Sequence, residues 1–473
     1  MPMFPVVRSG RAPLFTRHAL ALALACATGS ALIATPAIAA KKEAAAPKAS
    51  YSKQVIAAYV PAQKAAEAAA KRADVAAALQ KVKDAINAYN SATTSSARKA
   101  AEDQRVAAVA ALGGLLTTEK GLVDAVFAAV SVPDDKMLAG QLAVNVGTIA
   151  QDESLQRRGV QAMIDSGKLP ADELPKMYFY IGQFSFNAKD YPAAVTAYKT
   201  AIDGGYHAND VDVSLAEAYL LGNQTQAGLA QIQKAIDLRA ASGTPAPESW
   251  YRRGLQMAYK AKMYDAAAAF ARNEVAVYPT PENWEAAVGM LRLVGKYQAQ
   301  ESLDLMRLMA RTNSMNQSND YAEYLQAADA RRLPGEVLKV LNAGVAAGKL
   351  STTDVFVTEN RTIAQGRLAA DKSAMPALER DARAGNSTAA TVMAAGDVFL
   401  SYDDPVKAQE MFTLALTKPG VDTPRALTRL GIAQTDAGKY AEAQATFAKV
   451  TGLRQPIAQL WSVYAAQKAK AGA

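Results

Sequence analysis

The chain has 473 residues and a formal net charge of +8 at pH 7; 50% of its residues are hydrophobic and only 7% are aromatic. This hydrophobic content excludes a wholly disordered chain and supplies enough apolar surface for folded cores. The only cysteine is Cys26, and the only histidines are His18 and His207. These counts exclude a Cys/His zinc site, a disulfide framework and most nucleophile–histidine chemistry.

Residues 1–39 have the pattern of a cleaved signal peptide. Three arginines and no acid precede an apolar stretch over residues 19–39, which ends in an Ala-Ile-Ala tripeptide. A membrane anchor is the alternative, but Thr, Gly, Ser and Pro residues dilute the stretch. We therefore expect export, cleavage before Ala40 and a periplasmic location, with association with the outer membrane left open. The mature chain then has 49 basic and 44 acidic residues, no membrane span, and no block of like charge that suggests a nucleic-acid partner.

From Tyr51 onward the sequence has helical periodicity almost throughout. Alanine fills many helical positions, short Gly, Pro, Asn or Asp-rich joints separate the helix-length stretches, and no alternating strand pattern is evident. Two long helices are expected in 53–90, with breaks near Pro61 and Asp74, and about four shorter ones in 96–167. Residues 40–50 precede them as a short flexible leader. The 434 residues after residue 39 exceed what one core holds, so several domains or a repeating array must follow.

A repeated spacing of small and aromatic residues favours the array. In the unit at 424–457, Gly431 on a first helix is followed by Ala443 and Phe447 on a second helix. We expect the glycine to face the alanine, so that two antiparallel helices approach closely, and the aromatic ring to fill the space beside the next unit. Hairpins of this kind stack into a continuous core. The spacing recurs at 175–208 and 247–280 and, in part, at 209–242, 281–314 and 389–422.

Glycines also mark the expected ends of second helices, where a left-handed conformation costs them nothing. They are found at Gly167, Gly204-Gly205, Gly348, Gly385 and Gly420. The sequence from Gly344 to Lys349 is similar to a phosphate-binding loop, but it has three residues between its glycines and Leu350 where Ser or Thr is required. A helix cap is the better interpretation of that segment.

The repeated units resemble the tetratricopeptide repeat (TPR) family in their Leu-Gly, Gly-x-Tyr, Ala and aromatic positions. The resemblance covers residues 175–457 and is weaker at 318–388, which fits only as helix pairs. It implies an all-α fold, a right-handed superhelical solenoid of antiparallel helix hairpins with no significant β-sheet. Residues 51–174 fit as N-terminal helical hairpins, with a coiled-coil-like arm for oligomerisation as the alternative, and residues 456–473 fit as a capping helix and tail.

In this family the first helices line a groove that binds a partner. The alternative for the aromatic residues is that Tyr251 and Tyr259 pack between repeats while Arg252 is solvated. The Lys and Asn of the carboxylate-binding variant are absent, because Phe179, Gln183 and Val213 occupy those slots. The family's groove positions correspond here to Phe179, Gln183, Phe186, Tyr251, Arg252, Leu255, Tyr259, Glu285 and Arg292.

No constellation of catalytic or metal-binding residues stands out. Ser96 and Lys99 have the spacing of an acyl-serine enzyme but lie at an expected helix start, where Ser95 or Ser96 is a good N-cap. His207, Asp210 and Asp212 form an incomplete ligand set. We therefore predict no catalytic residue, cofactor or metal, and a non-catalytic scaffold that binds a protein or peptide in the cell envelope. The alternative is an envelope glycan-binding or polysaccharide-machinery accessory module, with sugar-stacking rings at Trp250, Tyr251, Tyr259 and Trp284.

Overall fold

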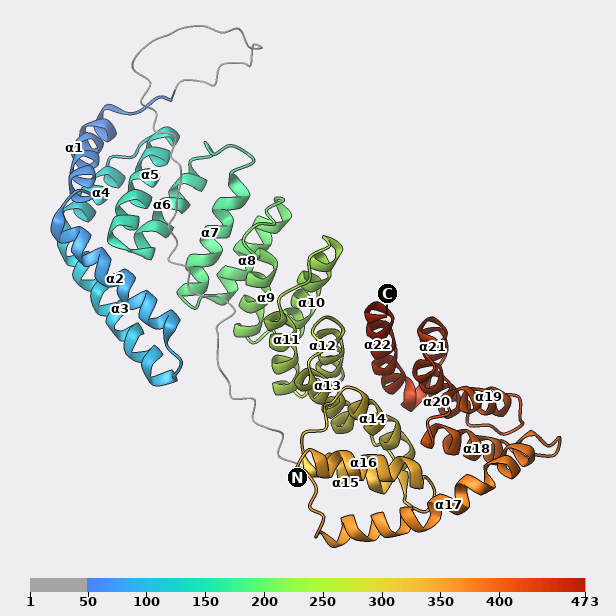
Figure 1. The fold of residues 1–473 in the computed structure, drawn as a ribbon. Helices are drawn as coiled ribbons and strands as arrows, with labels where there is room; N and C mark the ends of the chain where they lie inside the picture. The colour runs from blue at the N-terminus through green and yellow to red at the C-terminus, as the bar shows by residue number, and fades with distance from the viewer. Residues whose placement is uncertain (1–48, 473) are drawn as a thin grey trace. The chain divides into compact units, whose positions relative to one another are not determined.

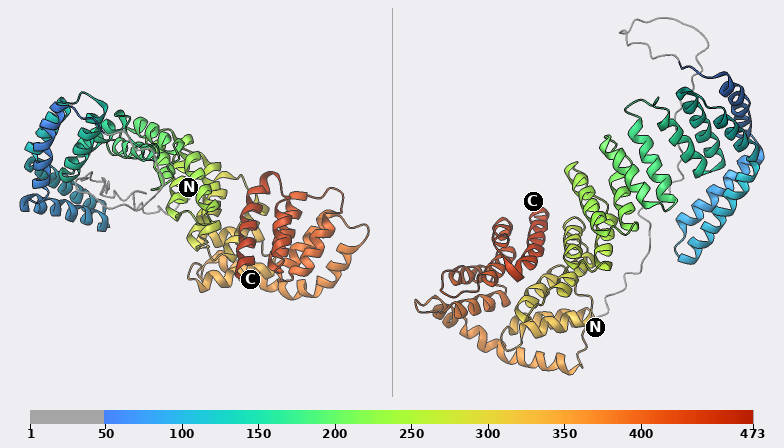
Figure 2. Two further views of the ribbon diagram at one scale, coloured as in Figure 1. Left: turned by 90° about the horizontal axis from the view of Figure 1, so that it is seen from above. Right: turned by 180° about the vertical axis from the view of Figure 1, so that it is seen from behind.

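The computed structural model describes residues 49–472, which form 22 α-helices, one 3-10 helix and no β-strand (Figures 1 and 2). The predicted all-α fold class is confirmed. The predicted signal peptide at 1–39 and most of the leader at 40–50 lie outside the described residues. The chain divides into two compact units, unit 1 ending at Ala235 and unit 2 beginning at Ile236. The domain boundaries drawn from the repeat pattern stay predictions.

Unit 1 begins with a group of paired helices. The helices α1 and α4 pack together against α5, while α2 and α3 pair as a hairpin whose base packs against the end of α5 (Figure 1). The break expected at Pro61 is wrong, because Pro61 lies inside α1, where Val55, Ala62 and Ala66 hold one face of the helix in the core. The helices are α1 (Lys53–Ala69), α2 (Ala73–Ser91), α3 (Ser95–Leu115), α4 (Thr117–Ala128), α5 (Pro133–Ala150), α6 (Glu153–Asp165), α7 (Leu174–Asn187), α8 (Tyr191–Asp203), α9 (Val211–Leu221) and α10 (Thr225–Ala241), which contains the unit boundary.

The carboxylate of Asp135, in the first turn of α5, forms hydrogen bonds with the start of the described chain. It is fully buried and accepts hydrogen bonds from the backbone N–H groups of Ser52 (2.9 Å), Ser131 (3.0 Å) and Val132 (3.2 Å). Burial alone would raise the pKa of Asp135, but these donors lower it to about 2. Asp135 is therefore a capping group at the start of α5.

Several hairpins carry a glycine beneath an aromatic ring. A Cβ added to Gly182 would lie 2.5 Å from the ring of Tyr198, so the ring, rather than the expected alanine, is the nearest neighbour of the glycine. Tyr198 also packs with Val211 and Leu215 of the next hairpin, as predicted for an aromatic ring that lies between consecutive hairpins. The same contact joins Gly254 to Phe270, Gly396 to Phe412 and Gly431 to Phe447.

Glycine meets glycine where α5 crosses α6 in unit 1. A Cβ on Gly140 would lie 2.6 Å from the carbonyl oxygen of Gly159, and the reverse contact is equally short. Because the obstacle is backbone, the two helices would have to move apart to admit a side chain.

We expect Gly140→Ala to lower the free energy of unfolding of unit 1 by about 1–3 kcal/mol, the usual cost of overpacking. Gly121→Ala is the matched control, because Gly121 lies within α4 and a Cβ there meets nothing within 4 Å. It should stabilise unit 1 by roughly 0.5–1 kcal/mol through helix propensity. Far-UV circular dichroism against denaturant would measure both, and equal shifts for the two variants would contradict the close crossing.

Unit 2 continues the series of hairpins and contains one long helix. The helix α17 has 29 residues and replaces the helix pair expected in that part of 318–388; Pro376 lies inside it. The helices are α11 (Glu248–Lys260), α12 (Tyr264–Val277), α13 (Pro281–Val294), α14 (Ala299–Arg311), α15 (Ser318–Ala328), α16 (Pro334–Ala346), α17 (Val355–Arg383), α18 (Ala389–Ser401), α19 (Pro405–Ala415), α20 (Thr423–Asp436), α21 (Tyr440–Phe447), the 3-10 helix η1 (Gly452–Arg454) and α22 (Gln455–Ala471).

The expected glycine caps are largely confirmed. Gly348 follows α16 with a φ of +66°, and the N–H of Lys349 donates to the carbonyl oxygen of Gly344 at 2.9 Å, which is a helix cap and not a phosphate loop. Gly385 does not share the left-handed conformation. The other left-handed caps are Gly167 (φ +62°), Gly205 (φ +90°) and Gly420 (φ +71°).

The last helix closes unit 2 on itself. The sequence predicts a helix at 456–473 that shields the array from solvent, and α22 is a helix there, but it packs between α20–α21 on one side and α12, α13 and α14 on the other. Trp461 is fully buried, and Tyr464 meets Trp284 of α13 edge-on with 6.2 Å between ring centroids. The side chain of Gln467 donates to the carbonyl oxygen of Val275 at 2.6 Å. Because both faces of α22 are covered, it is an internal closing helix and not a solvated cap.

The helix α14 lies at the centre of this closed unit. Its seven consecutive residues from Leu303 to Met309 are each at most 1% exposed. A helix buried on every side is normally apolar all round. Two of these seven residues, Asp304 and Arg307, are charged, so their charges must be paired inside the unit.

Candidate interaction surface

In unit 2, the inner faces of α18 and α20 are filled by the chain itself. On α20, Thr428 and Ile432 are completely buried, and Arg429 donates from Nε to Oδ1 of Asp304 on α14 at 3.3 Å. On α18, Asp397 is 2% exposed and lies 4.0 Å from Nη1 of Arg307, also on α14. Buried side chains of α18 and α20 therefore meet the central helix α14.

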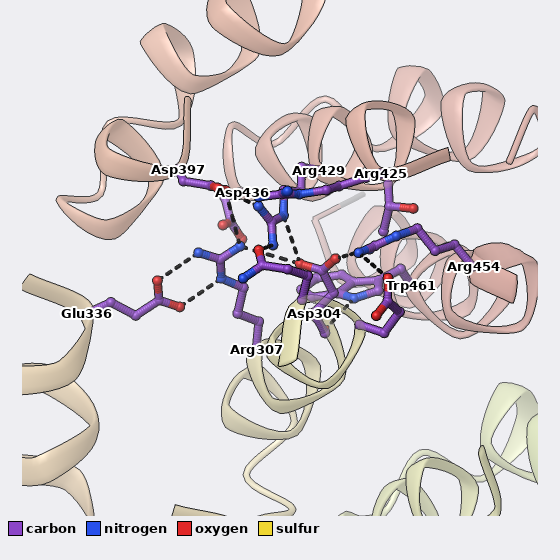
Figure 3. Close-up of polar contacts among 12 residues, drawn as sticks. Asp304, Arg307, Glu336, Asp397, Arg425, Arg429, Asp436, Arg454 and Trp461 are labelled. Atoms are coloured by element: carbon purple, nitrogen blue, oxygen red, sulfur yellow. Dashed lines mark hydrogen bonds and ion pairs between the residues drawn. The ribbon is translucent and has the colours of Figure 1, made fainter. Parts of the chain in front are cut away.

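A buried ion cluster joins these helices (Figure 3). It contains four arginines and four carboxylates, so its formal charges balance. Trp461 closes the cluster on one side, because its indole N–H donates to the backbone oxygen of Asp304 at 2.9 Å. The members are Glu301, Asp304 and Arg307 on α14, Glu336 on α16, Asp397 on α18, Arg425 and Arg429 on α20, and Arg454 on η1.

Asp304 is the shared acceptor of the cluster. Arg454 donates to its Oδ2 at 2.5 Å, and Arg307 and Arg429 approach its Oδ1 at 3.4 and 3.3 Å. Burial alone would raise the pKa of Asp304, but the three guanidinium groups hold it below its ordinary value. The carboxylate therefore stays ionised in the core.

Glu336 is also a buried carboxylate that accepts hydrogen bonds from arginine, but from one arginine rather than three. Arg307 donates to both of its oxygens at 2.7 Å, and the hydroxyl of Tyr324 donates to Oε1 at 2.8 Å. Burial opposes ionisation, yet Arg307 lowers the pKa of Glu336. Removing one member of such a cluster leaves a buried charge without its partner, which costs far more than an exposed ion pair is worth.

Of the groove residues predicted from the sequence in unit 2, some are buried and others are exposed to solvent. Tyr251 is 3% exposed and meets Tyr278 edge-on, so it packs between helices as the alternative interpretation has it. Tyr259 is 43% exposed beside Tyr264, and Leu255 is half-buried.

The polar members of this set link consecutive hairpins. Arg252 donates to Glu274 and Glu248 within its own hairpin and, at 3.3 Å, to Asn283 of the next one, so it is paired rather than merely solvated. Glu285 accepts from the side chain of Asn316 at 2.8 Å, and Arg292 donates to Asp320 at 3.0 Å and also pairs with Glu323. Whether any of them also binds a partner stays a prediction.

The ion pair of Glu274 makes unit 2 sensitive to pH. The Glu274 side chain is 2% exposed, and burial raises its pKa to about 7 against the pull of Arg252. Because the folded state holds this proton more tightly than the unfolded chain, the contribution of Glu274 to stability increases as pH falls from about 7 toward 4.5.

We expect Glu274→Gln to stabilise unit 2 at pH 8, by up to about 3 kcal/mol from the size of the pKa shift, and to lose this advantage at pH 5. All three tryptophans lie in unit 2, so tryptophan fluorescence against denaturant reports on that unit alone. Glu282→Gln, at an exposed site on the neighbouring α13, is the control. The same gain at both pH values would show that Glu274 is not protonated in this range.

In unit 1, one side of α7, the first helix of its hairpin, has side chains that the rest of the chain does not fully bury. Phe179, predicted for the groove, is 3% exposed and packs against Tyr206 with 5.1 Å between ring centroids, so it belongs to the core. Gln183 and Phe186 are half-buried, and Phe186 meets Tyr191 edge-on. Within residues 49–472, the amide of Gln183 has no hydrogen-bond partner.

The same face continues onto α5, which sequence reasoning missed. Gln141 is half-buried and Asn145 is exposed, and neither has a hydrogen-bond partner in the part of the chain that the structure describes. The sequences Gly140-Gln141 and Gly182-Gln183 each have an Asn four residues after the Gln, at Asn145 and Asn187. This 42-residue repeat of Gln and Asn is the signal that could have found the face.

A cavity of about 460 Å³ lies at the end of this face, where α5 and α7 approach α3 and α4. Its charges are paired: Lys120 meets Asp152 at 2.6 Å, and the amide of Asn187 donates to Glu153 at 3.2 Å. Arg105 lines the α3 side and is paired with Glu102 at 2.9 Å. The cavity is therefore polar with both signs of charge.

The aromatic residues that suggested sugar binding are mostly inside unit 2. Trp250, Tyr251 and Trp284 are 5%, 3% and 2% exposed, and only Tyr259 presents a ring to solvent. Stacking on a sugar requires an exposed ring face. Three of the four rings that motivated the glycan-binding alternative are buried and do not meet this requirement.

The candidate metal-binding and nucleophilic residues that the sequence singled out are not brought together within residues 49–472. Within residues 49–472, no group of three His, Cys, Asp or Glu side chains could hold a metal ion, and His207 meets only Asp212, at 3.8 Å. Ser96 lies in the first turn of α3, where Thr94, rather than Ser95 or Ser96, is the N-cap. Among the described helices, none alone is long and apolar enough to cross a membrane, although α3 and α4, bent by 67°, pass that test as a pair.

No protein-family model matches the chain, and no curated protein sequence matches it. Three solved structures are similar to it at low identity. The complex of the TPR2AB domain of yeast Sti1 with pHSP90 shows 13% identity over 63% of this chain and 96% of that one, with a TM-score of 0.22. Naa15/Naa10 bound to HypK-THB shows 12% identity over 86% and 70%, with a TM-score of 0.33. The Cut9-Hcn1 tetramer of the APC/C shows 13% identity over 69% and 66%, with a TM-score of 0.23. All three TM-scores are below 0.5, so these likenesses carry no argument about this chain.

Proposed function

We propose that this protein is a non-catalytic scaffold that is exported to the cell envelope and binds a polypeptide partner there. The TPR-like hairpin architecture supports the general role of a protein-interaction scaffold. Export and a periplasmic location follow from the signal-peptide pattern of residues 1–39 alone.

One observation supports the location of the binding surface. In unit 2, buried polar side chains of α18 and α20 pair with α14, whereas in unit 1 α5 and α7 have side chains that are exposed or half-buried, with amides that lack partners within residues 49–472. A helical scaffold can bind only through a face that its own helices leave open. Leu255 and Tyr259 on α11 are also half-buried or exposed, but the amides without partners lead us to place the partner on α5 and α7, of which Gln183 and Phe186 were predicted from the sequence.

The test is capture of the protein from its own cell envelope after crosslinking in living cells. The double variant Gln141→Arg, Gln183→Arg places two long charged side chains on the proposed face, and Gln161→Arg, on an exposed position of α6, is the matched control. A stoichiometric polypeptide that is lost only from the double variant would support the proposal. Retention of that polypeptide by the double variant would reject this face, and capture of a glycan without protein would favour the accessory-module alternative.

A further inference from the structure

The cavity in unit 1 has the size and the mixed lining of a small-molecule site. Its volume of about 460 Å³ lies within the range of roughly 300–1,000 Å³ that is usual for such sites. Helices α3 to α7 all contribute residues to it. Its apolar lining residues are Val109, Ala110 and Gly113 on α3 and Ala150 on α5. A molecule with a short apolar part and one polar group suits such a lining.

The two cations that line the cavity each have a carboxylate partner. Arg105 donates from both Nε and Nη2 to the two oxygens of Glu102, at 2.9 Å each. Lys120 lies 2.6 Å from Asp152. Glu102 and, at longer range, Glu153 raise the pKa of Arg105, but no ion pair joins Arg105 to Glu153 within residues 49–472. Glu153 is therefore the charged lining residue that has no cation of its own.

Three polar lining residues have acceptor oxygens with few donors or none. Both oxygens of Glu153 accept only from the side-chain amide of Asn187, at 3.2 Å each. The amide of Gln151 donates to the carbonyl oxygen of Thr148 at 2.8 Å. In the part of the chain that the structure describes, the side-chain oxygens of Asn187 and Gln151 accept no hydrogen bond. Because Asn187 is bonded to Glu153 and Gln151 lies two residues before it, these acceptors lie close together.

The helix ends around the cavity also favour a positive charge. The helix α5 ends at Ala150 and α7 ends at Asn187, and both residues line the cavity. The carbonyl end of a helix has a partial negative charge. The helix α6 begins at Glu153, but its N-terminus is capped by Asp152, whose carboxylate accepts from the N–H of Leu155 at 3.0 Å. Two carbonyl ends therefore lie at the cavity with one capped N-terminus.

We propose that this cavity binds a small primary amine, whose ammonium group is held by Glu153, Asn187 and Gln151. A primary ammonium has three N–H donors, and the three side chains supply the acceptors. The alkyl chain of the amine packs against the apolar lining residues of α3 and α5. The cavity uses neither Gln141 nor Gln183, so the amine site and the proposed scaffold function can fail separately.

The test is calorimetric titration of the purified protein with hexylamine and with three compounds of the same chain length: hexanol, hexanoate and hexyltrimethylammonium. Glu153→Gln removes the charge and keeps the shape of the side chain. Asp165→Asn, at an exposed position at the other end of α6, is the matched control. Ala110→Phe places a ring at the apolar lining and tests the location without changing a charge.

We expect hexylamine alone to bind, and Glu153→Gln and Ala110→Phe each to weaken its binding about fivefold to tenfold, as loss of a charge-assisted hydrogen bond or of the apolar space would. Asp165→Asn should change the affinity by less than about twofold, and added salt should weaken binding of the amine. Equal far-UV melting curves would show that the variants are folded.

The other three compounds decide which part of the proposal fails. Binding of hexyltrimethylammonium as tight as that of hexylamine would overturn recognition by the three acceptors, because the trimethyl group has no N–H donor. Tighter binding of hexanoate would overturn a cation site. Absence of hexylamine binding, or an unchanged affinity in both Glu153→Gln and Ala110→Phe, would overturn the cavity as the amine site and leave the scaffold function standing.

Discussion

Arg429→Met is expected to lower the free energy of unfolding of unit 2 by about 3–5 kcal/mol, the usual cost of removing one partner from a buried ion pair. Arg429 is fully buried and donates to Asp304, to Asp397 and, at 2.8 Å, to the side chain of Gln300. Methionine fills much of the same space but leaves two buried carboxylates short of a donor. Tryptophan fluorescence against denaturant measures the effect in unit 2.

The control for this prediction is Arg380→Met on α17, where the arginine side chain is 76% exposed and its nearest acid lies at 3.9 Å. An exposed pair contributes about 0–1 kcal/mol, so the control should leave stability nearly unchanged. Adding Asp397→Leu to Arg429→Met removes one of the stranded carboxylates and should restore part of the loss. If Arg429→Met costs no more than Arg380→Met, the ion cluster does not hold unit 2 closed.

The helices and their hairpins could be predicted because their signals are local. The spacing of Gly431 and Phe447 lies within one hairpin, and the structure places the ring directly on the glycine. Gly348 caps α16 through bonds to residues one turn before it. Each of these contacts spans fewer than about twenty residues, so periodicity and cap residues are enough to place it.

The closure of unit 2 could not be predicted in this way. Asp304 and Arg429 are 125 residues apart in sequence, and Asp304 and Trp461 are 157 apart. An Asp or Arg on a helix usually marks the solvated face, so nothing local distinguishes these buried charges from exposed ones. For the same reason α22 is expected from the sequence to be a solvated cap, although Trp461 contacts Phe447 of α21 and Tyr464 contacts Trp284 of α13.

The candidate site was predicted only in part. Gln183 and Phe186 were found through the family's groove positions, but the same rule selected Phe179 and Tyr251, which are core residues here. Groove positions are assigned by helix register, and register alone does not say how tightly the next hairpin covers a side chain. Gln141 was missed because α5 lies outside the region of clear resemblance, although its 42-residue spacing to Gln183 is visible in the sequence.

Trp461→Ala is expected to lower the free energy of unfolding of unit 2 by about 3–5 kcal/mol, the range for emptying a large aromatic site in a core. The indole is fully buried, stacks on Phe447 at 6.4 Å between ring centroids and donates to the backbone of Asp304 on the central helix. Alanine leaves a cavity and removes the indole N–H bond to Asp304, so the change acts on the contact that joins α22 to α14. The remaining tryptophans, Trp250 and Trp284, still report unfolding of this unit.

Leu453→Ala in the adjacent η1 is the matched control, because Leu453 is 53% exposed and should change stability by less than about 0.5 kcal/mol. Trp461→Phe keeps an aromatic ring and should fall between the two. A cost for Trp461→Ala as small as that of Leu453→Ala would mean that α22 does not close the unit. The inner faces of α18 and α20 would then be open in solution, and the case for placing the partner on α5 and α7 rather than in unit 2 would be lost.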